Sequence, residues 1–350
     1  MKKILFITTN HLGNKNYNDM MISVFNKLDI AYEIIVLERN EGIIKLPFCS
    51  IIECFYCSFL VYRKYLKLNK TFGLIFFHGS ELIFFFSKIK SKKIMSLDAP
   101  KFSIKTPKSV LYKDRSIKTK FNFFIFKTLY KRSFSRVDVF LPWTNLCRQI
   151  LYEKFSIPQS KMKIIQTYLD IKVWHPIKKE ISGKCLLVGN NLERKGGYFI
   201  IEVFEKYLQK NSLTIITSDN IKKRSNIKVL IGLSRQDIIK EYQQADLFLF
   251  PTFFDQFGIV ITEAMACGVP IIMRNIGGGV ELVKDSQSGI VLPYKSSELD
   301  WAQCIQSLFI DRQKLNQFSK NARSFAEKNF SKDVNSNILR KVIKDLSVNK

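Results

Sequence analysis

Two carboxylates, Asp255 and Glu263, are separated by seven residues in an otherwise apolar part of the sequence. Glu263 lies in the helix-forming run 259–266, which follows Gly258, whereas Asp255 precedes that glycine. A helix that opens after Gly258 presents unbonded N–H groups and the positive end of its dipole, and both bind anions. Glu263 would lie roughly 7–8 Å along the helix from that end, at about 1.5 Å per residue. A ligand with hydroxyl groups at both ends and a diphosphate between them, such as a nucleotide sugar, suits this layout.

A second group with chemical potential is the basic pair Arg194-Lys195, which follows a predicted buried strand ending at Gly189 and precedes Gly196-Gly197. The guanidinium group offers a planar fork for phosphate oxygens, and the ammonium group offers a point charge. The pair therefore predicts a phosphate-binding site. The alternative is a surface basic pair at the start of a helix.

His78 and Asp98 each follow a predicted strand. Because the carboxyl ends of parallel strands form the usual ligand-binding edge of an α/β sheet, both are candidates for contact with an acceptor or a sugar. The alternative is structural: His78 would cap a turn, and Asp98 would cap Ala99-Pro100.

The elements that must position these residues alternate between strands and helices along the whole chain. Strands are expected over 4–8, 32–37, 73–77, 93–96, 137–141, 163–166, 185–188, 213–217, 228–230, 247–251 and 269–273. Helices are expected over 18–28, 144–155, 198–210, 235–244, 258–266, 297–309, 311–329 and 332–346. Continuously apolar strands in this alternation predict parallel sheets covered on both faces.

The chain of 350 residues is too long for one ordinary core. We therefore predict two Rossmann-like α/β domains that face a central cleft, over residues 1–176 and 177–350. The first would lie on the acceptor side and the second would bind the nucleotide sugar. The last helix, 332–346, is a candidate to pack back on the first domain.

The formal net charge of +26 calls for an anionic partner. Between residues 60 and 136 there are 19 Lys and Arg but three acids, with aromatic residues interleaved. Such a segment suits an anionic lipid surface, since apolar groups enter the interface while Lys pairs with headgroups. The alternative is a solvated basic face over an ordinary core.

Several classes of protein are disfavoured. Lys2-Lys3 precedes too short an apolar run for a secretory signal, and no run is long enough to span a membrane. We thus expect a cytoplasmic protein, peripheral on the inner face of the membrane.

An NAD-dependent oxidoreductase and a metalloprotein are also disfavoured. The first strand of each predicted domain is not followed by the Gly-x-Gly-x-x-Gly motif of an NAD-dependent oxidoreductase. Cys54 and Cys57 have metal-like spacing, but no second Cys/His pair follows, and neither a metal nor a cofactor is expected.

The segment from Asp255 to Pro270 resembles glycosyltransferase family 4, which has the two-domain GT-B fold. The match runs through Phe257-Gly258 and Glu263-Ala-Met-Ala-x-Gly268-x-Pro270, whereas Asp255 stands in place of the family's first Glu. The resemblance implies that Glu263 holds the nucleotide ribose. It also implies that Asp255 contacts the donor sugar, with help from the N–H groups of Gly258, Ile259 and Val260.

The resemblance extends to other candidate residues. Arg194 and Lys195 would neutralise the diphosphate leaving group; Lys195-Gly196 matches directly, and Asn190 occupies the place of the usual Arg. Gly13 would belong to a glycine loop that faces the donor diphosphate. Glu281, after Gly277-Gly278, is either a ligand contact or a residue at the start of a helix.

The implied activity is transfer of a hexose-type unit from a nucleoside-diphosphate sugar to a glycan or glycolipid acceptor. The reaction would be metal-independent and would retain anomeric configuration, in the synthesis of bacterial surface polysaccharide or lipopolysaccharide. One alternative is a basic nucleic-acid-binding protein, although no recognition motif supports it. Another is an inactive relative that only binds the donor, because Asp255 departs from the pattern.

Overall fold

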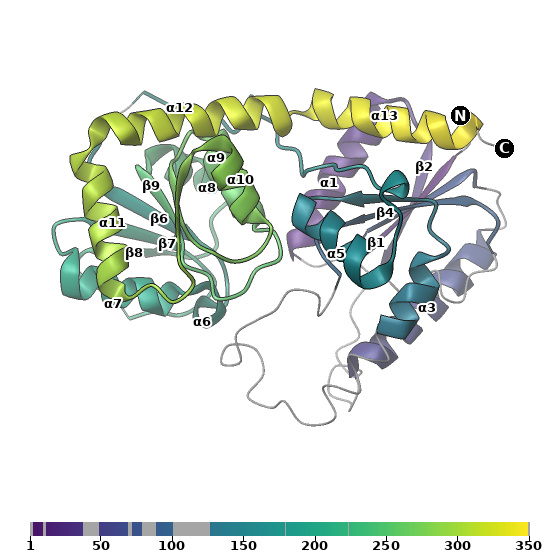
Figure 1. Ribbon diagram of the computed structural model, residues 1–350, viewed down its shortest axis with the longest axis horizontal. Coiled ribbons are helices and arrows are strands. Elements are labelled where there is room, and N and C mark those ends of the chain that lie inside the picture. The colour runs from purple at the N-terminus through teal and green to yellow at the C-terminus, as the bar shows by residue number, and fades with distance from the viewer. Residues whose placement is uncertain are drawn as a thin grey trace. The chain divides into compact units, whose positions relative to one another are not determined.

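The computed structural model describes residues 3–9, 12–37, 49–68, 72–78, 89–100, 127–178, 180–222 and 224–348, and the chain divides into two compact units (Figure 1). The first unit contains the described residues up to Thr167 and those from Asn335 onward, and the second contains residues 168–334. The division thus falls before residue 176, the predicted boundary. Most of the last helix is part of the first unit.

The first unit is built on a parallel sheet of five strands in the order β2-β1-β3-β4-β5. The strands are β1 (Ile4–Thr9), β2 (Tyr32–Leu37), β3 (Leu74–His78), β4 (Lys92–Leu97) and β5 (Val139–Pro142). Its helices include α1 (Leu12–Lys27), α3 (Cys49–Lys67), α5 (Asn145–Phe155) and α13 (Lys332–Val348). The strand order reverses between β1 and β3, so a ligand-binding edge is expected where these two strands end.

Two sequence-based expectations in the first unit were wrong. The first helix begins at Leu12 rather than residue 18, which places Gly13 in its first turn. The expected strand at 163–166 is absent from the described sheet, where only an isolated bridge joins Met162 to Phe140. The N–H of Ile165 donates to the carbonyl oxygen of Pro142, but proline has no N–H to continue a ladder.

The second unit is built on a parallel sheet of six strands in the order β11-β10-β9-β6-β7-β8. The strands are β6 (Lys184–Val188), β7 (Ser212–Ile216), β8 (Ile227–Leu230), β9 (Leu247–Phe250), β10 (Ile271–Arg274) and β11 (Gly289–Leu292). The helices are α6 (Leu192–Lys195), α7 (Gly197–Tyr207), α8 (Arg235–Gln244), α9 (Ile259–Ala266), α10 (Gly279–Ser286), α11 (Glu298–Ile310) and α12 (Arg312–Asn329). In this sheet the order reverses between β6 and β9.

Burial explains why the central strands of the second unit form. Every residue of β9 and β10 is buried, and apart from Arg274 at the end of β10 these strands are apolar throughout instead of alternating. Helix α11 packs on α7, and its Trp301 is fully buried in the core below them, while α12 packs on α9 (Figure 1). The two parallel sheets confirm the predicted fold class of two Rossmann-like domains.

Candidate functional site

The predicted site residues of the second unit lie at the point where its strand order reverses. Strands β6 and β9 are neighbours in the sheet. The segment after β6 carries Arg194 and Lys195, and the loop after β9, residues 251–255, carries Asp255. Crevices outside the carboxyl ends of strands at such reversals are the usual ligand sites of open α/β sheets.

Helix α6 holds the basic pair in place through two polar caps. Asn191, with φ +60°, is the N-cap, and its side-chain oxygen accepts a hydrogen bond from the N–H of Arg194 at 3.1 Å. The carboxylate of Asp219 accepts from the N–H groups of Asn191 at 3.2 Å and Leu192 at 2.6 Å. A helix of four residues has little stability of its own, so these caps fix its position.

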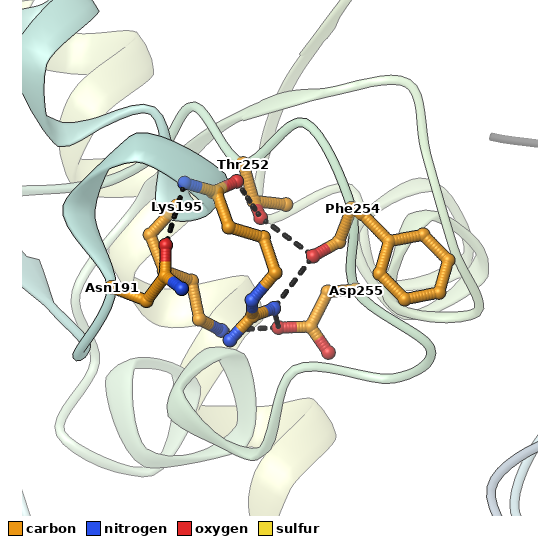
Figure 2. Close-up of polar contacts among 6 residues, drawn as sticks. Asn191, Lys195, Thr252, Phe254 and Asp255 are labelled. Carbon is orange, nitrogen blue, oxygen red and sulfur yellow. Dashed lines mark hydrogen bonds and ion pairs between the residues drawn. The ribbon is translucent and has the colours of Figure 1, made fainter. Parts of the chain in front are cut away.

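The structure brings Arg194, Lys195 and Asp255 together (Figure 2). The Lys195 ammonium forms an ion pair with the Asp255 carboxylate, and Nη1 of Arg194 lies 3.9 Å from Oδ2 of the same carboxylate. Nη1 also donates to the carbonyl oxygen of Phe254 at 2.7 Å. These side chains keep some exposure, at 30% for Arg194, 13% for Lys195 and 18% for Asp255, so a ligand can reach the charges.

Helix α9 supplies the other half of the site. Gly258 is its N-cap with φ +84°, a conformation that favours glycine, and Ile259 and Val260 open the helix. Their N–H groups belong to the first turn, where the helix itself offers no acceptors. This turn lies three residues after the 251–255 loop, and free N–H groups at the start of a helix are able to bind an anion.

Glu263 is buried within α9 and is 7% exposed. Burial raises its pKa to about 7, against smaller lowering effects of a hydrogen bond from Tyr242 and of the Arg235 charge. The Tyr242 hydroxyl donates to Oε2 of Glu263 at 3.0 Å. Sequence reasoning missed Tyr242; its only signal was a position three residues after Ile239 on the apolar face of a predicted helix.

The glycines before α10 pack closely against the backbone of Asp255 and Gln256. Gly277 has φ +74°, and a Cβ there would lie 2.3 Å from the carbonyl oxygen of Asp255. The N–H of Gly278 donates to the carbonyl oxygen of Gln256 at 2.7 Å. Glu281 lies in the first turn of α10, as the structural alternative for it requires.

In the first unit, the candidate residue His78 is buried against aromatic rings. His78 is 3% exposed, and its ring lies against those of Tyr17 and Trp143, with centroid distances of 4.0 and 5.4 Å, while the Tyr17 and Trp143 rings are 4.9 Å from each other. Burial lowers the pKa of His78 to about 4, so this imidazole is neutral at physiological pH. Its Nδ1 lies 3.1 Å from the carbonyl oxygen of Ser96. Packing therefore accounts for His78 in this structure.

Asp98 follows β4, and its Oδ1 accepts a hydrogen bond from the N–H of Ala99 at 2.7 Å. This is the capping contact that was its structural alternative. Gly13 lies in the first turn of α1, after β1, and His78 ends β3, so these two residues flank the reversal point of the first sheet.

The described residues contain no group of three His, Cys, Asp or Glu side chains able to hold a metal ion. Cys57 is buried, and the side chain of Cys54 lies outside the described part, as does most of the aromatic segment 121–127. No described helix is long and apolar enough to cross a membrane.

Comparison with known proteins gives matches to glycosyltransferases. A family model described as glycosyl transferases group 1 matches residues 177–325. An uncharacterized glycosyltransferase of Methanocaldococcus jannaschii is 25% identical over 177 residues, 42% of this chain and 45% of the relative. The chain thus matches less than half the length of the curated relatives.

Solved structures resemble the whole chain. HepE of Anabaena, crystallised with UDP, has a TM-score of 0.71 at 15% identity over 99% of this chain and 100% of its own. WaaG, a glycosyltransferase involved in lipopolysaccharide biosynthesis, has a TM-score of 0.68 at 13% identity over 96% and 99%. At these identities the likeness concerns the fold, which is that of the GT-B glycosyltransferases.

Proposed function

We propose that the protein transfers a sugar from a nucleoside-diphosphate sugar to a glycan or lipid-linked acceptor, because residues 177–325 match the family model described as glycosyl transferases group 1. The observation that carries the proposal is the meeting of Arg194, Lys195 and Asp255 beside the first turn of α9. Cations and helix N–H groups on one side and a carboxylate on the other match a diphosphate and a sugar. UDP in the crystal structure of HepE is consistent with this ligand class.

In the proposed reaction the bond between the anomeric carbon and the diphosphate oxygen breaks, and its electron pair leaves with the diphosphate. Arg194 and Lys195 neutralise the charge that develops there, which is electrostatic stabilisation of the transition state. The acceptor hydroxyl forms the new bond to the anomeric carbon, and its proton passes to the departing diphosphate. Two fixed cations can supply this stabilisation without a metal, and family likeness favours retention of configuration.

The remaining protein groups would orient the donor. The Glu263 carboxylate accepts hydrogen bonds from the ribose hydroxyls, as acidic residues do in dinucleotide-binding folds. Asp255 accepts from hydroxyls of the sugar. The same carboxylate pairs with Lys195, so the two charges balance each other in the structure.

We propose an acceptor of the surface polysaccharide or lipopolysaccharide type, presented at the inner face of the membrane, with the enzyme cytoplasmic and peripheral. Two facts support this: the excess of positive charge between residues 60 and 136, and the role of the similarly folded WaaG in lipopolysaccharide biosynthesis. Of the remaining candidates, Gly13 would face the donor diphosphate, and Asp98 and His78 would shape the acceptor side.

The test is thermal-shift screening of the wild-type protein against UDP-, GDP- and ADP-sugars, followed by donor turnover with the best ligand. We expect stabilisation by one nucleotide class and its loss in Glu263→Ala. A matched control is Glu327→Ala, because Glu327 is an exposed carboxylate of α12, outside the site.

Three other outcomes of this screen would contradict the proposed function or change it. Lack of stabilisation by any nucleotide sugar, or an equal response from Glu263→Ala, would show that this site does not bind the donor. Binding without turnover would identify an inactive relative. Salt-sensitive binding of RNA, with no effect of nucleotide sugars, would favour the nucleic-acid alternative.

A further inference from the structure

Arg274, the last residue of β10, is a buried cation that the family motifs do not explain. It is 2% exposed and has no ion pair with an acid among the described residues. Four aromatic rings surround its guanidinium carbon, with centroids at 4.5 Å for Phe253, 4.9 Å for Phe199, 5.5 Å for Tyr294 and 5.7 Å for Trp301. Their π faces offset part of the cost of burying the charge.

The guanidinium group makes its hydrogen bonds to the main chain. Nε donates to the carbonyl oxygen of Pro251 at 3.1 Å, and Nη1 donates to that of Tyr294. Nη2 is buried, and no described group accepts from it. Burying a cation with an unsatisfied N–H costs free energy, so a core that served packing alone would be better filled by an apolar side chain.

Two of these contacts, with Pro251 and Phe253, are made directly to the 251–255 loop. Pro251, whose carbonyl oxygen Arg274 binds, starts the loop, and Phe253 provides the ring closest to the guanidinium carbon. The Tyr294 hydroxyl donates to the carbonyl oxygen of Phe253 at 3.3 Å. On the other side, the carbonyl oxygen of Arg194 accepts from the N–H of Phe253 at 2.9 Å. The loop is therefore held between α6 and the end of β10.

We propose that Arg274 is a positioning residue that fixes the 251–255 loop and thereby holds the Asp255 carboxylate beside the Lys195 ammonium group. The inference rests on the proposed function for its catalytic consequence, but its structural part does not. Helix α9 has separate support, because Tyr242 bonds to Glu263 from α8. Loss of Arg274 should therefore disturb the sugar end of the donor site and leave the nucleotide end in place.

The experiment compares Arg274→Met and Arg274→Lys with the wild type by hydrogen exchange and donor kinetics. Arg323→Lys and Arg323→Met are the matched controls, because Arg323 also donates to main-chain carbonyls, those of Trp174, Ala266 and Ile171, away from the loop. We expect faster amide exchange confined to residues 252–257 in Arg274→Met. We also expect kcat to fall by about tenfold to a hundredfold, with nucleotide affinity within about threefold, as for misplacement of a catalytic group by roughly 1 Å. Arg274→Lys, which keeps the charge but loses the fork, should recover part of kcat.

Several outcomes would overturn the inference. Exchange at 252–257 that equals the wild type, or that rises across the whole second unit as in the Arg323 variants, would remove the role in positioning. Faster loop exchange with unchanged kcat would show that the position of Asp255 does not depend on Arg274. If the wild type turns over no donor, the proposed function fails, while the exchange pattern still decides whether Arg274 fixes the loop.

Discussion

At the scale of single residues, the buried carboxyl group of Glu263 lowers the stability of the folded protein at neutral pH. Its carboxylate is buried, and its pKa of about 7 lies above the ordinary value of 4.5. Between these pH values the folded state binds more protons than the unfolded state, so stability falls as pH rises and the penalty is complete above about pH 7. A tenfold change in proton affinity corresponds to about 1.4 kcal/mol, so the penalty amounts to roughly 3 kcal/mol.

Glu263→Gln should therefore be more stable than the wild type at pH 8, by up to about 3 kcal/mol, and nearly equal to it at pH 4.5. Glutamine stays neutral and can still accept the hydrogen bond from Tyr242. Urea unfolding at both pH values measures the difference. Glu327→Gln, at an exposed carboxylate, should show little pH-dependent change. Equal stability of Glu263→Gln and wild type at pH 8 would contradict the buried, costly carboxylate.

Sequence reasoning reached the central residues of the site because they follow strands. Arg194, Lys195 and Asp255 each come after a buried apolar run, and neighbouring strands bring such residues together. His78 satisfied the same rule, yet its ring is buried against those of Tyr17 and Trp143. Arg274 was missed because its aromatic partners come from α7, α11 and the segments after β9 and β11, a convergence that exists only in the folded chain.

At the scale of elements, a glycine joins the two halves of the site. Gly196, between α6 and α7, has φ +71°, and a Cβ there would lie 2.2 Å from the carbonyl oxygen of Pro251. That carbonyl also accepts from Arg274, so it has little room to move. Gly232 has a similar φ of +69°, but a Cβ there would meet nothing within 4 Å. A comparison of Gly196 with Gly232 therefore separates the cost of a left-handed backbone from the cost of a steric clash.

We expect Gly232→Ala to lower the free energy of unfolding by about 1–2 kcal/mol, the cost of left-handed backbone for an L-residue. Gly196→Ala should cost a further 1–3 kcal/mol or so, because the Pro251 carbonyl must shift to accommodate the methyl group. Urea unfolding of both variants measures this difference. Equal destabilisation would mean that α6 and the 251–255 loop can move apart without cost.

Element boundaries were predictable where caps and periodicity agreed. The helix expected over 235–244 is preceded by Ser234 with Asp237 three residues later, a typical capping pattern, and the structure has α8 at those bounds with the Ser234 cap in place. Helix α3 was not predicted, because its sequence is apolar on most faces and lacks an acid in its first turn. Strand β11 was missed as well; it has four residues, none of them buried, so the apolar signal is weak.

At the scale of the whole molecule, the net charge of +26 favours an anionic partner, and we propose that one exposed helix face contacts a lipid surface. On α3, Phe59 and Leu66 are 58% and 57% exposed. Arg63 and Lys67 are exposed too, and the spacing of these four residues puts them on one face. Apolar groups flanked by cations suit an anionic bilayer, where headgroups pair with the cations and the acyl region accepts the apolar side chains.

The double variant Phe59→Ser/Leu66→Ser should bind phosphatidylglycerol-containing vesicles about tenfold more weakly than the wild type, since each apolar side chain that enters the interface contributes on the order of 1 kcal/mol. Vesicle sedimentation measures this, and raised salt should weaken the binding that remains, because the cations act through screened charges.

Ile310→Ser is the matched control for the double variant, since Ile310 is 83% exposed but belongs to the second unit. Equal partition onto neutral and anionic vesicles, or an equal loss in Ile310→Ser, would leave the basic segment as a solvated face. A surface that brings the enzyme to the membrane would raise the local concentration of a lipid-linked acceptor, so vesicle binding and transfer to such an acceptor should be lost together in the double variant.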